Sequence, residues 1–283
     1  MGVRETRDLI GRHGVRPTKS LGQNFLVDDN VLAKIAAQGA LSAADLVIEV
    51  GPGLGGLTRH LAAQAGRVVA VEIDRHLLPA LAEATADLAN VSVVHADILD
   101  CDLASLAGGW TGPVKVVANL PYYITTAIVM KFLEEFPACE RLVLLVQREV
   151  ADRMAAKPGT KDYGSLSVAV QYHAAPRRAF LVAPTCFLPP PEVDSAVVVL
   201  EVRRAPPVAL ADRRLFFSVV RAAFGQRRKT LHNALGGSGL VPGGRDALAG
   251  ILAELGLPPA VRGEALSMEQ FAQLANRIAS AKS

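Results

Sequence analysis

The chain has 283 residues, of which 51% are hydrophobic, 20% charged and 5% aromatic. This composition is typical of a globular protein with a sizeable core, and it excludes the disordered, collagen-like and disulfide-stapled classes. The net charge is only +3, but residues 1–20 carry +3, residues 21–204 carry −5 and residues 205–283 carry +5. Two basic ends therefore flank an acidic middle, a distribution that favours a polyanionic partner.

Signals for membrane insertion, export and metal binding are missing from the sequence. The longest apolar runs hold about five residues, whereas a bilayer span needs about 20. The N-terminus is basic but has no apolar stretch of the signal-peptide type, so we expect a cytoplasmic location. The three cysteines form no C-x-x-C pair and the six histidines never show metal-ligand spacing. We therefore expect neither disulfides nor a metal site.

Short β-branched runs alternate with helical patterns from about residue 30 to residue 202. This alternation predicts an α/β domain whose mostly parallel sheet carries helices on both faces. Seven strands are expected, at residues 46–50, 68–72, 92–96, 115–119, 142–147, 166–173 and 195–202. The last strand follows a proline-rich extended stretch at 187–194, and little helix separates the last three strands, so we expect the last strand to be antiparallel.

The pattern changes after Arg204. A short APP linker leads into three helical segments, at 215–224, 245–255 and 268–279. We therefore expect a basic N-terminal leader over residues 1–20, a catalytic domain over 21–204 and a small all-helical domain over 205–283. The leader is expected to be disordered in the absence of RNA.

The segment LVIEVGPGLGGLT (46–58) combines a strand, a glycine-rich turn and a helix start. Such a turn lets the backbone approach a nucleotide-like ligand at the carboxyl edge of the sheet, although a plain tight turn uses the same residues. Glu72 ends the second strand, where a carboxylate can bind both ribose hydroxyls of an adenosine, and Asp97 ends the third. With Glu49 beneath the loop, these acids favour the positively charged S-adenosylmethionine over NAD, whose pyrophosphate they would repel.

The motif NLPYYI (119–124) stands at the end of the fourth strand. An adenine N6 amine is a poor nucleophile, and the side-chain oxygen of Asn119 and the carbonyl of Leu120 can accept its two N–H bonds and direct it at a methyl group. Pro121 fixes the turn and offers no competing donor, while Tyr122 can stack on an extruded base. Alignment supplies most of the catalysis, because the attacked carbon already bears a sulfonium leaving group.

Motifs distributed over nearly the whole chain are similar to those of one family. They are SLGQNFL (20–26), IEVGPGLGGLT (48–58), VEID (71–74), ADIL (96–99), NLPYYI (119–124), QREVADR (147–153), YGSLSV (163–168), FLPPPEVDSAVV (187–198) and FGQRRKTLHNAL (224–235). Through them the chain resembles the bacterial small-subunit ribosomal RNA adenine N6,N6-dimethyltransferases. The resemblance implies a Rossmann-like class I S-adenosylmethionine-dependent methyltransferase fold.

The resemblance also implies roles for individual residues. The implied cofactor contacts are Asn24, Leu26, Gly51, Glu72, Asp97 and Asn119, and the implied surroundings of the target adenine are Asn119, Leu120, Pro121, Tyr122 and Phe187. The implied reaction is dimethylation of two adjacent adenosines near the 3′ end of 16S rRNA. The residues themselves would not have indicated Asn24, Leu26 or Phe187, which look locally like loop, cap and packing positions.

The basic C-terminal end predicts how the substrate binds. Four cations lie on or beside one expected helix, namely Arg221, Arg227, Arg228 and Lys229. Arginines contact phosphates bidentately, which suits a folded RNA surface. We therefore expect these residues to bind 16S rRNA within the immature 30S subunit, with the protein acting as a monomer.

Three other interpretations use the same residues. A 23S rRNA adenine methylase shares the catalytic motif but differs in its C-terminal region, and FGQRRKTLHNAL favours the small-subunit enzyme. A ribosome-assembly factor could carry the fold with methylation incidental or lost, although the intact NLPY motif and both strand-end acids argue against a lost activity. A nicotinamide oxidoreductase would share the glycine loop and Glu72.

Overall fold

The computed structural model describes residues 2–18, 21–226 and 229–281. The chain divides into two compact units. The first consists of Met1–Ala151 and Ala174–Val202, and the second of Asp152–His173 and Arg203–Ser283. Within the described residues, no helix is long and apolar enough to span a membrane.

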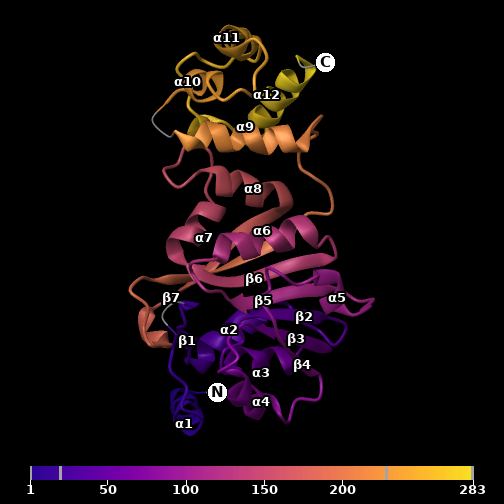
Figure 1. Cartoon of the computed structure of the whole chain (residues 1–283), viewed down its shortest axis with the longest axis vertical. Helices are drawn as coiled ribbons and strands as arrows, with labels where there is room; N and C mark the ends of the chain where they lie inside the picture. Colours follow the sequence, from indigo (N-terminus) through magenta and orange to yellow (C-terminus); the bar gives the residue numbers. More distant parts are fainter. Residues whose placement is uncertain (1, 19–20, 227–228, 282–283) are drawn as a thin grey trace. The chain divides into compact units, whose positions relative to one another are not determined.

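The first unit is built on a seven-stranded sheet in the order β4-β3-β2-β5-β6-β9-β7 (Figure 1). Its strands are β2 (Leu46–Val50), β3 (Arg67–Glu72), β4 (Val91–His95), β5 (Val114–Asn119), β6 (Cys139–Gln147), β7 (Ala174–Val182) and β9 (Ser195–Val202). Neighbouring strands from β4 to β6 pair in parallel, whereas β9 runs antiparallel to both β6 and β7. The expected α/β fold and the antiparallel last strand are confirmed.

Helices flank this sheet. They are α1 (Val3–His13), α2 (Asp29–Gln38), α3 (Gly56–Ala62), α4 (Leu78–Thr85), α5 (Leu103–Ala107), α6 (Thr125–Glu135) and the start of α7 (Arg148–Met154). One face of the sheet is buried by α2 and α3, where Ile35 and Leu61 share a core with Val47 and Val143. Outside the sheet, β1 (Phe25–Leu26) pairs antiparallel with β8 (Phe187–Leu188) after a short 3-10 turn at Pro184–Cys186.

The prediction of a strand at 166–173 is wrong, because this segment forms the helix α8 (Ser165–His173). The alternating apolar residues of LSVAVQYH resemble a strand, but Val168 and Tyr172, four residues apart, share a helical face buried in the core of the second unit. The strand lies one segment later as β7. Its arginines and Pro176 concealed it, because such residues are typical of a sheet edge.

The N-terminal leader forms the helix α1, so the expectation of disorder is wrong for its described part. Leu9 is 3% exposed and packs with Leu54, Leu77 and Ala80 of the first unit. His13 Nε2 lies 2.6 Å from a carboxylate oxygen of Glu83 on α4, a contact across 70 residues that the local sequence could not reveal.

The second unit is helical. Besides α8 it contains α9 (Arg213–Gly225), α10 (Leu231–Gly236), α11 (Gly244–Glu254), a 3-10 turn at Gly263–Ala265 and α12 (Met268–Ser280). Phe216, Leu235, Leu248 and Phe271 form its buried core. Residues 152–173, which the sequence pattern placed with the sheet, belong to this unit.

Candidate functional site

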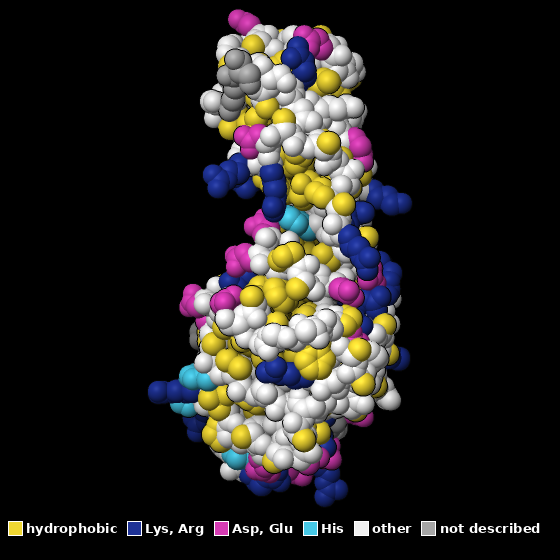
Figure 2. All heavy atoms as spheres, turned by 90° about the vertical axis from the view of Figure 1, so that its right-hand side faces the viewer, with side chains coloured by type: hydrophobic (Ala, Val, Ile, Leu, Met, Phe, Trp, Pro, Cys, Tyr) yellow, Lys and Arg dark blue, Asp and Glu magenta, His cyan; other side chains and the backbone are white. Residues whose placement is uncertain are grey.

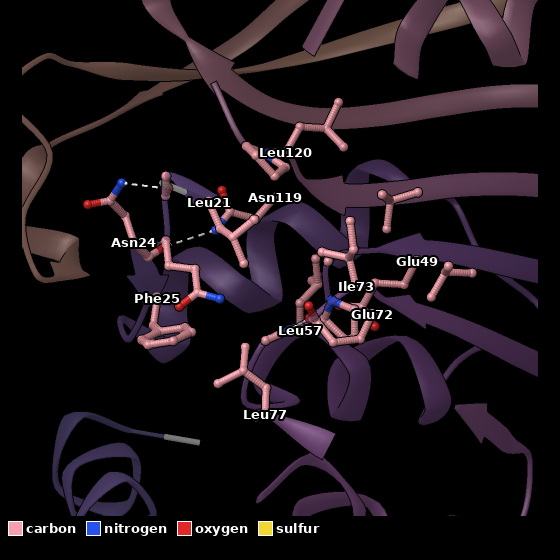
Figure 3. A pocket seen from close by; sticks show the side chains of 18 of the residues that line it. Leu21, Asn24, Phe25, Glu49, Leu57, Glu72, Ile73, Leu77, Asn119 and Leu120 are labelled. Atoms are coloured by element: carbon pink, nitrogen blue, oxygen red, sulfur yellow. Dashed lines mark hydrogen bonds between the residues drawn. The ribbon is translucent and has the colours of Figure 1, made fainter. Parts of the chain in front are cut away.

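One pocket of the first unit lies where β2, β3 and β5 end (Figure 3). It holds about 1080 Å³ of space not filled by atoms, open solvent at its mouth included. The structure brings nine of the sequence-predicted residues together in its lining: Asn24, Leu26, Gly51, Glu72, Asp97, Asn119, Leu120, Pro121 and Tyr122.

The glycine-rich loop after β2 forms the floor of this pocket. Gly53 has a φ of +58°, and a Cβ added there would lie 3.2 Å from the ring of Phe25. Both the backbone conformation and the close approach of this ring disfavour a larger residue. The loop therefore leaves backbone exposed to a ligand where a side chain would otherwise intrude.

Glu72 joins this loop to the end of β3. Its side chain is 4% exposed, and its two carboxylate oxygens accept the backbone N–H groups of Gly53 at 3.1 Å and Asp74 at 2.8 Å. Burial raises the pKa of Glu72, and these two backbone hydrogen bonds oppose that shift. Each oxygen keeps a second lone pair, so the carboxylate can still accept hydroxyl donors from a ligand.

Glu49 places a second carboxyl group beside the pocket (Figure 3). Glu49 is 1% exposed, and its Oε2 atom has no hydrogen-bond partner among the described residues. Burial raises the pKa of Glu49 to about 8, and the negative charge of Glu72 adds to the shift. The Thr58 side chain opposes this shift, and with a pKa of about 8 the carboxyl group of Glu49 is largely protonated, and so uncharged, at neutral pH.

Asp97 lies two residues after the end of β4. Its Oδ1 atom accepts the backbone N–H of Leu99 at 2.8 Å, and the residue is half-buried in the lining of the pocket. One carboxylate oxygen is thus held by the backbone, and the acid is fixed at the sheet edge as the sequence predicts.

The segment from Leu21 to Leu26 lies along the pocket and is tied down at two points. Asn119 donates from Nδ2 to the carbonyl of Asn24 at 3.2 Å, and Asn24 donates to the carbonyl of Gly22 at 3.0 Å (Figure 3). Gln23 donates from Nε2 to Asp74 at 2.8 Å. Sequence reasoning missed Gln23 and Asp74, and only the presence of both in motifs of the resembled family could have suggested them.

The NLPYYI motif (119–124), here called the reaction motif, begins at the last residue of β5. Because the Nδ2 atom of Asn119 is engaged by Asn24, the Oδ1 atom is the end of this amide that is left to accept a donor. The backbone N–H of Leu120 donates to the carbonyl of Leu145 at 3.1 Å, which holds the loop against β6. Tyr122 is half-buried, its hydroxyl lies 2.6 Å from Oγ of Ser195, and burial raises its pKa.

Among the described residues, Phe187 is the one predicted site residue that pairs with a pocket-lining residue, Leu26, without lining the pocket itself. It is 4% exposed, pairs with Leu26 across β1 and β8, and packs in the sheet core with Val182 and Val197. It is not among the residues that line the pocket. In this structure Phe187 supports the segment containing Leu26, and its contact with an adenine stays a prediction.

The predicted RNA-binding cations belong to the second unit. Arg221 is exposed on α9, and Lys229 lines a polar hollow with Gln226, Asn233 and Arg245. Arg227 and Arg228 lie outside the described residues. On the face shown in Figure 2, basic side chains are interspersed with acidic ones.

A seven-stranded sheet with one antiparallel strand, a glycine loop after β2 and acids at the ends of β3 and β4 define a class I methyltransferase fold with a helical C-terminal region. The family model of ribosomal RNA adenine dimethylases matches residues 15–280. The chain belongs to this family, which confirms the resemblance found in the motifs, and it is an rRNA methyltransferase.

Individual relatives agree with this assignment. The ribosomal RNA small subunit methyltransferase A of Pelotomaculum thermopropionicum is 51% identical, over 95% of this chain and 94% of its own. The protein of the same name from Clostridioides difficile is 48% identical, over 96% of this chain and 94% of its own. Among solved structures, the 23S rRNA methyltransferase ErmE is 31% identical with a TM-score of 0.68, over 90% of this chain and 100% of its own.

A dimethyladenosine transferase from Plasmodium falciparum shares the fold. Its TM-score is 0.79 over 91% of this chain and 98% of its own, at 23% identity.

Proposed function

We propose that this enzyme transfers methyl groups from S-adenosylmethionine to the N6 atoms of two adjacent adenosines near the 3′ end of 16S rRNA. The observation that carries the proposal is the position of Asn119 and Tyr122, which line the same pocket as Glu72 and Asp97. A base acceptor, a stacking ring and two acids for an adenosine-containing cofactor thus border one cavity.

The charge of the pocket supports S-adenosylmethionine as the methyl donor. The carboxylate of Glu72 suits a pair of ribose hydroxyls, and the Oε2 atom of Glu49 suits a hydrogen-bond donor. Asp97 offers a carboxylate oxygen to an adenine amino group. When bound, this cofactor supplies a methyl group activated by a sulfonium. NAD is disfavoured because its pyrophosphate would lie near the carboxylates of Glu72 and Asp97.

The residues of the chain perform binding and alignment. Oδ1 of Asn119 accepts a hydrogen bond from an N–H of the adenine amine, which favours a pyramidal nitrogen with its lone pair directed into the pocket. The ring of Tyr122 stacks on a base that has left the RNA stack. Methyl transfer leaves the nitrogen with a proton of low pKa that water can accept, so the site needs no strong general base.

The relatives favour the small subunit as the target. Proteins named for the small subunit reach 51% identity with this chain, whereas the 23S rRNA methyltransferase ErmE reaches 31%. The basic residues Arg221, Arg227, Arg228 and Lys229 are proposed to contact phosphates of the immature 30S particle, to which the enzyme binds as a monomer in the cytoplasm.

Nucleoside mass spectrometry tests the proposal. Purified enzyme and S-adenosylmethionine are incubated with 30S particles that lack dimethyladenosine, with protein-free 16S rRNA and with 50S particles. We expect N6,N6-dimethyladenosine in the 3′ fragment of 16S rRNA from 30S particles, poor modification of the other two substrates, and none with the Asn119→Ala variant. Preferential modification of 23S rRNA, or no modified adenosine in any substrate, would overturn the proposal.

A further inference from the structure

A buried serine from another part of the sheet meets the tyrosine of the reaction motif. The hydroxyl of Tyr122 lies 2.6 Å from Oγ of Ser195, 73 residues away in the chain, and Ser195 is fully buried. Ser195 does not line the pocket, whereas Tyr122 does. The serine therefore reaches the site through the tyrosine.

The antiparallel strand explains why this serine is available. Ser195 is the first residue of β9 and pairs with Gln147 at the end of β6 and with Val182 at the end of β7. A parallel strand would begin at the far edge of the sheet, away from the ligand. Because β9 runs the other way, its first residue lies where β5 and β6 end.

The backbone at Ser195 is held on both sides. It lies between two paired strands, and the carbonyl of the preceding Asp194 accepts the backbone N–H of Arg148 at 3.0 Å. The loop that bears Tyr122 is fixed separately, by Leu120 donating to Leu145 and by the Thr125 hydroxyl donating to Pro121 at 3.0 Å. The tyrosine is thus anchored at its backbone by its own loop and at its hydroxyl by the sheet.

We propose that Ser195 is a positioning residue for methyl transfer, which fixes the ring plane of Tyr122 in the wall of the pocket through the hydroxyl pair. This inference rests on the proposed function. It implies that Tyr122 contributes its ring face to the reaction and that its hydroxyl is committed to the protein. Phenylalanine at position 122 would keep the ring but lose the hydrogen bond to Ser195. The ring would then be less ordered before the base binds, and ordering it would cost free energy during the reaction.

A double-mutant cycle tests the pairing. In single-turnover assays with saturating 30S particles and cofactor, we expect Ser195→Ala to slow methylation about 5- to 20-fold, since a misplaced group costs alignment. Tyr122→Phe should slow it by a similar factor. In the Tyr122→Phe background, Ser195→Ala should change the rate less than about twofold, because the pair is already broken. The Kd for S-adenosylmethionine should stay unchanged in all variants.

The matched control is Ser167→Ala. Ser167 is equally buried and its hydroxyl also makes a hydrogen bond, but it lies in the second unit. It should cost thermal stability without slowing single-turnover methylation. Two results would overturn the inference. One is a near-normal methylation rate for Ser195→Ala, and the other is a decrease caused by Ser195→Ala in the Tyr122→Phe background that equals its effect in the unaltered protein. Ser195 would then be only a hydrogen-bonded hydroxyl of the core.

A spectroscopic readout separates this inference from the proposed substrate. The chain has four tyrosines, so 19F NMR of protein labelled with 3-fluorotyrosine gives few resonances, and Tyr122→Phe assigns one of them. In Ser195→Ala we expect the Tyr122 resonance to shift and broaden while the other three stay in place. An unmoved resonance would refute the anchor even if 16S rRNA is methylated, whereas a moved one would support it even if the substrate were different.

Discussion

Replacing Glu72 with glutamine is the sharpest test of the cofactor site, because the side chain keeps its size while its charge is removed. Both carboxylate oxygens already accept a backbone N–H, from Gly53 and from Asp74. An amide can accept at one of these positions only, and its NH2 group would face an N–H donor at the other. Glu72→Gln should therefore disturb the glycine loop as well as the ligand contact.

General hydrogen-bond strengths give the expected loss of cofactor affinity. Two charge-assisted hydrogen bonds to ribose hydroxyls contribute about 1.5 to 3 kcal/mol each, and a single neutral bond from the amide contributes about 0.5 to 1.5 kcal/mol. The net loss in binding free energy is roughly 1.5 to 5.5 kcal/mol. Because about 1.4 kcal/mol corresponds to a factor of ten, Kd should rise at least about 10-fold.

Titration calorimetry with S-adenosylmethionine measures this change. Glu135→Gln is the matched control, since Glu135 lies exposed on α6 and pairs with Lys131, and its Kd should equal that of the unaltered protein. Thermal unfolding of Glu72→Gln checks that the fold persists. If a folded Glu72→Gln binds the cofactor within twofold of the unaltered protein, the assignment of Glu72 to the ribose is wrong.

The other predictions concern chemistry, pH and salt. Asn119→Ala should slow single-turnover methylation by more than about 100-fold with little change in RNA affinity, and a near-normal rate would exclude the polar-acceptor mechanism. The pKa of Glu49 is raised to about 8, so its contribution to stability is present at low pH and is lost as pH rises toward 8. In urea unfolding of the ligand-free protein, Glu49→Gln should therefore gain free energy of unfolding relative to the unaltered protein between about pH 5 and pH 8.5, and a difference that is constant with pH would contradict the shift. Replacing Arg227 and Arg228 together with alanine should weaken binding to 30S particles and flatten its salt dependence by roughly one to two units of slope, and an unchanged slope would show that these cations do not bind phosphate.

The fold could be predicted from the sequence where the hydrophobic periodicity and the residue types indicated the same element. The strands at 46–50 and 195–202 were predicted with the bounds that the structure has, since both are short runs rich in valine and other apolar residues next to turn residues. The run at 166–173 misled, because apolar alternation over a short segment does not distinguish a strand from a helix with one buried face. The charged face of α1 concealed a helix whose packing depends on residues far along the chain.

The site followed from the sequence only for residues whose own chemistry is distinctive. Glu72 and Asn119 were predicted from their residue type and their position at a strand end, and both line the pocket. The pairs Gln23 with Asp74 and Tyr122 with Ser195 join segments 51 and 73 residues apart, so no local pattern could reveal them. Phe187 is a different case. The family motif suggested a contact with the adenine, but a motif does not reveal the direction of a side chain, and this one is buried in the structure.

The interrupted second unit has a consequence for synthesis of the chain. Residues 152–173 leave the ribosome before β7 and β9, yet Val168 and Tyr172 are buried in a core whose other members lie mostly on α9 and later segments. A nascent chain therefore carries an apolar helix without its partners until most of the C-terminal segment has been translated, which is a window for chaperone binding. A chain cut at Arg204 would keep this helix exposed for good, so the sheet unit should be obtained free of aggregation only if residues 152–173 are replaced by a polar linker.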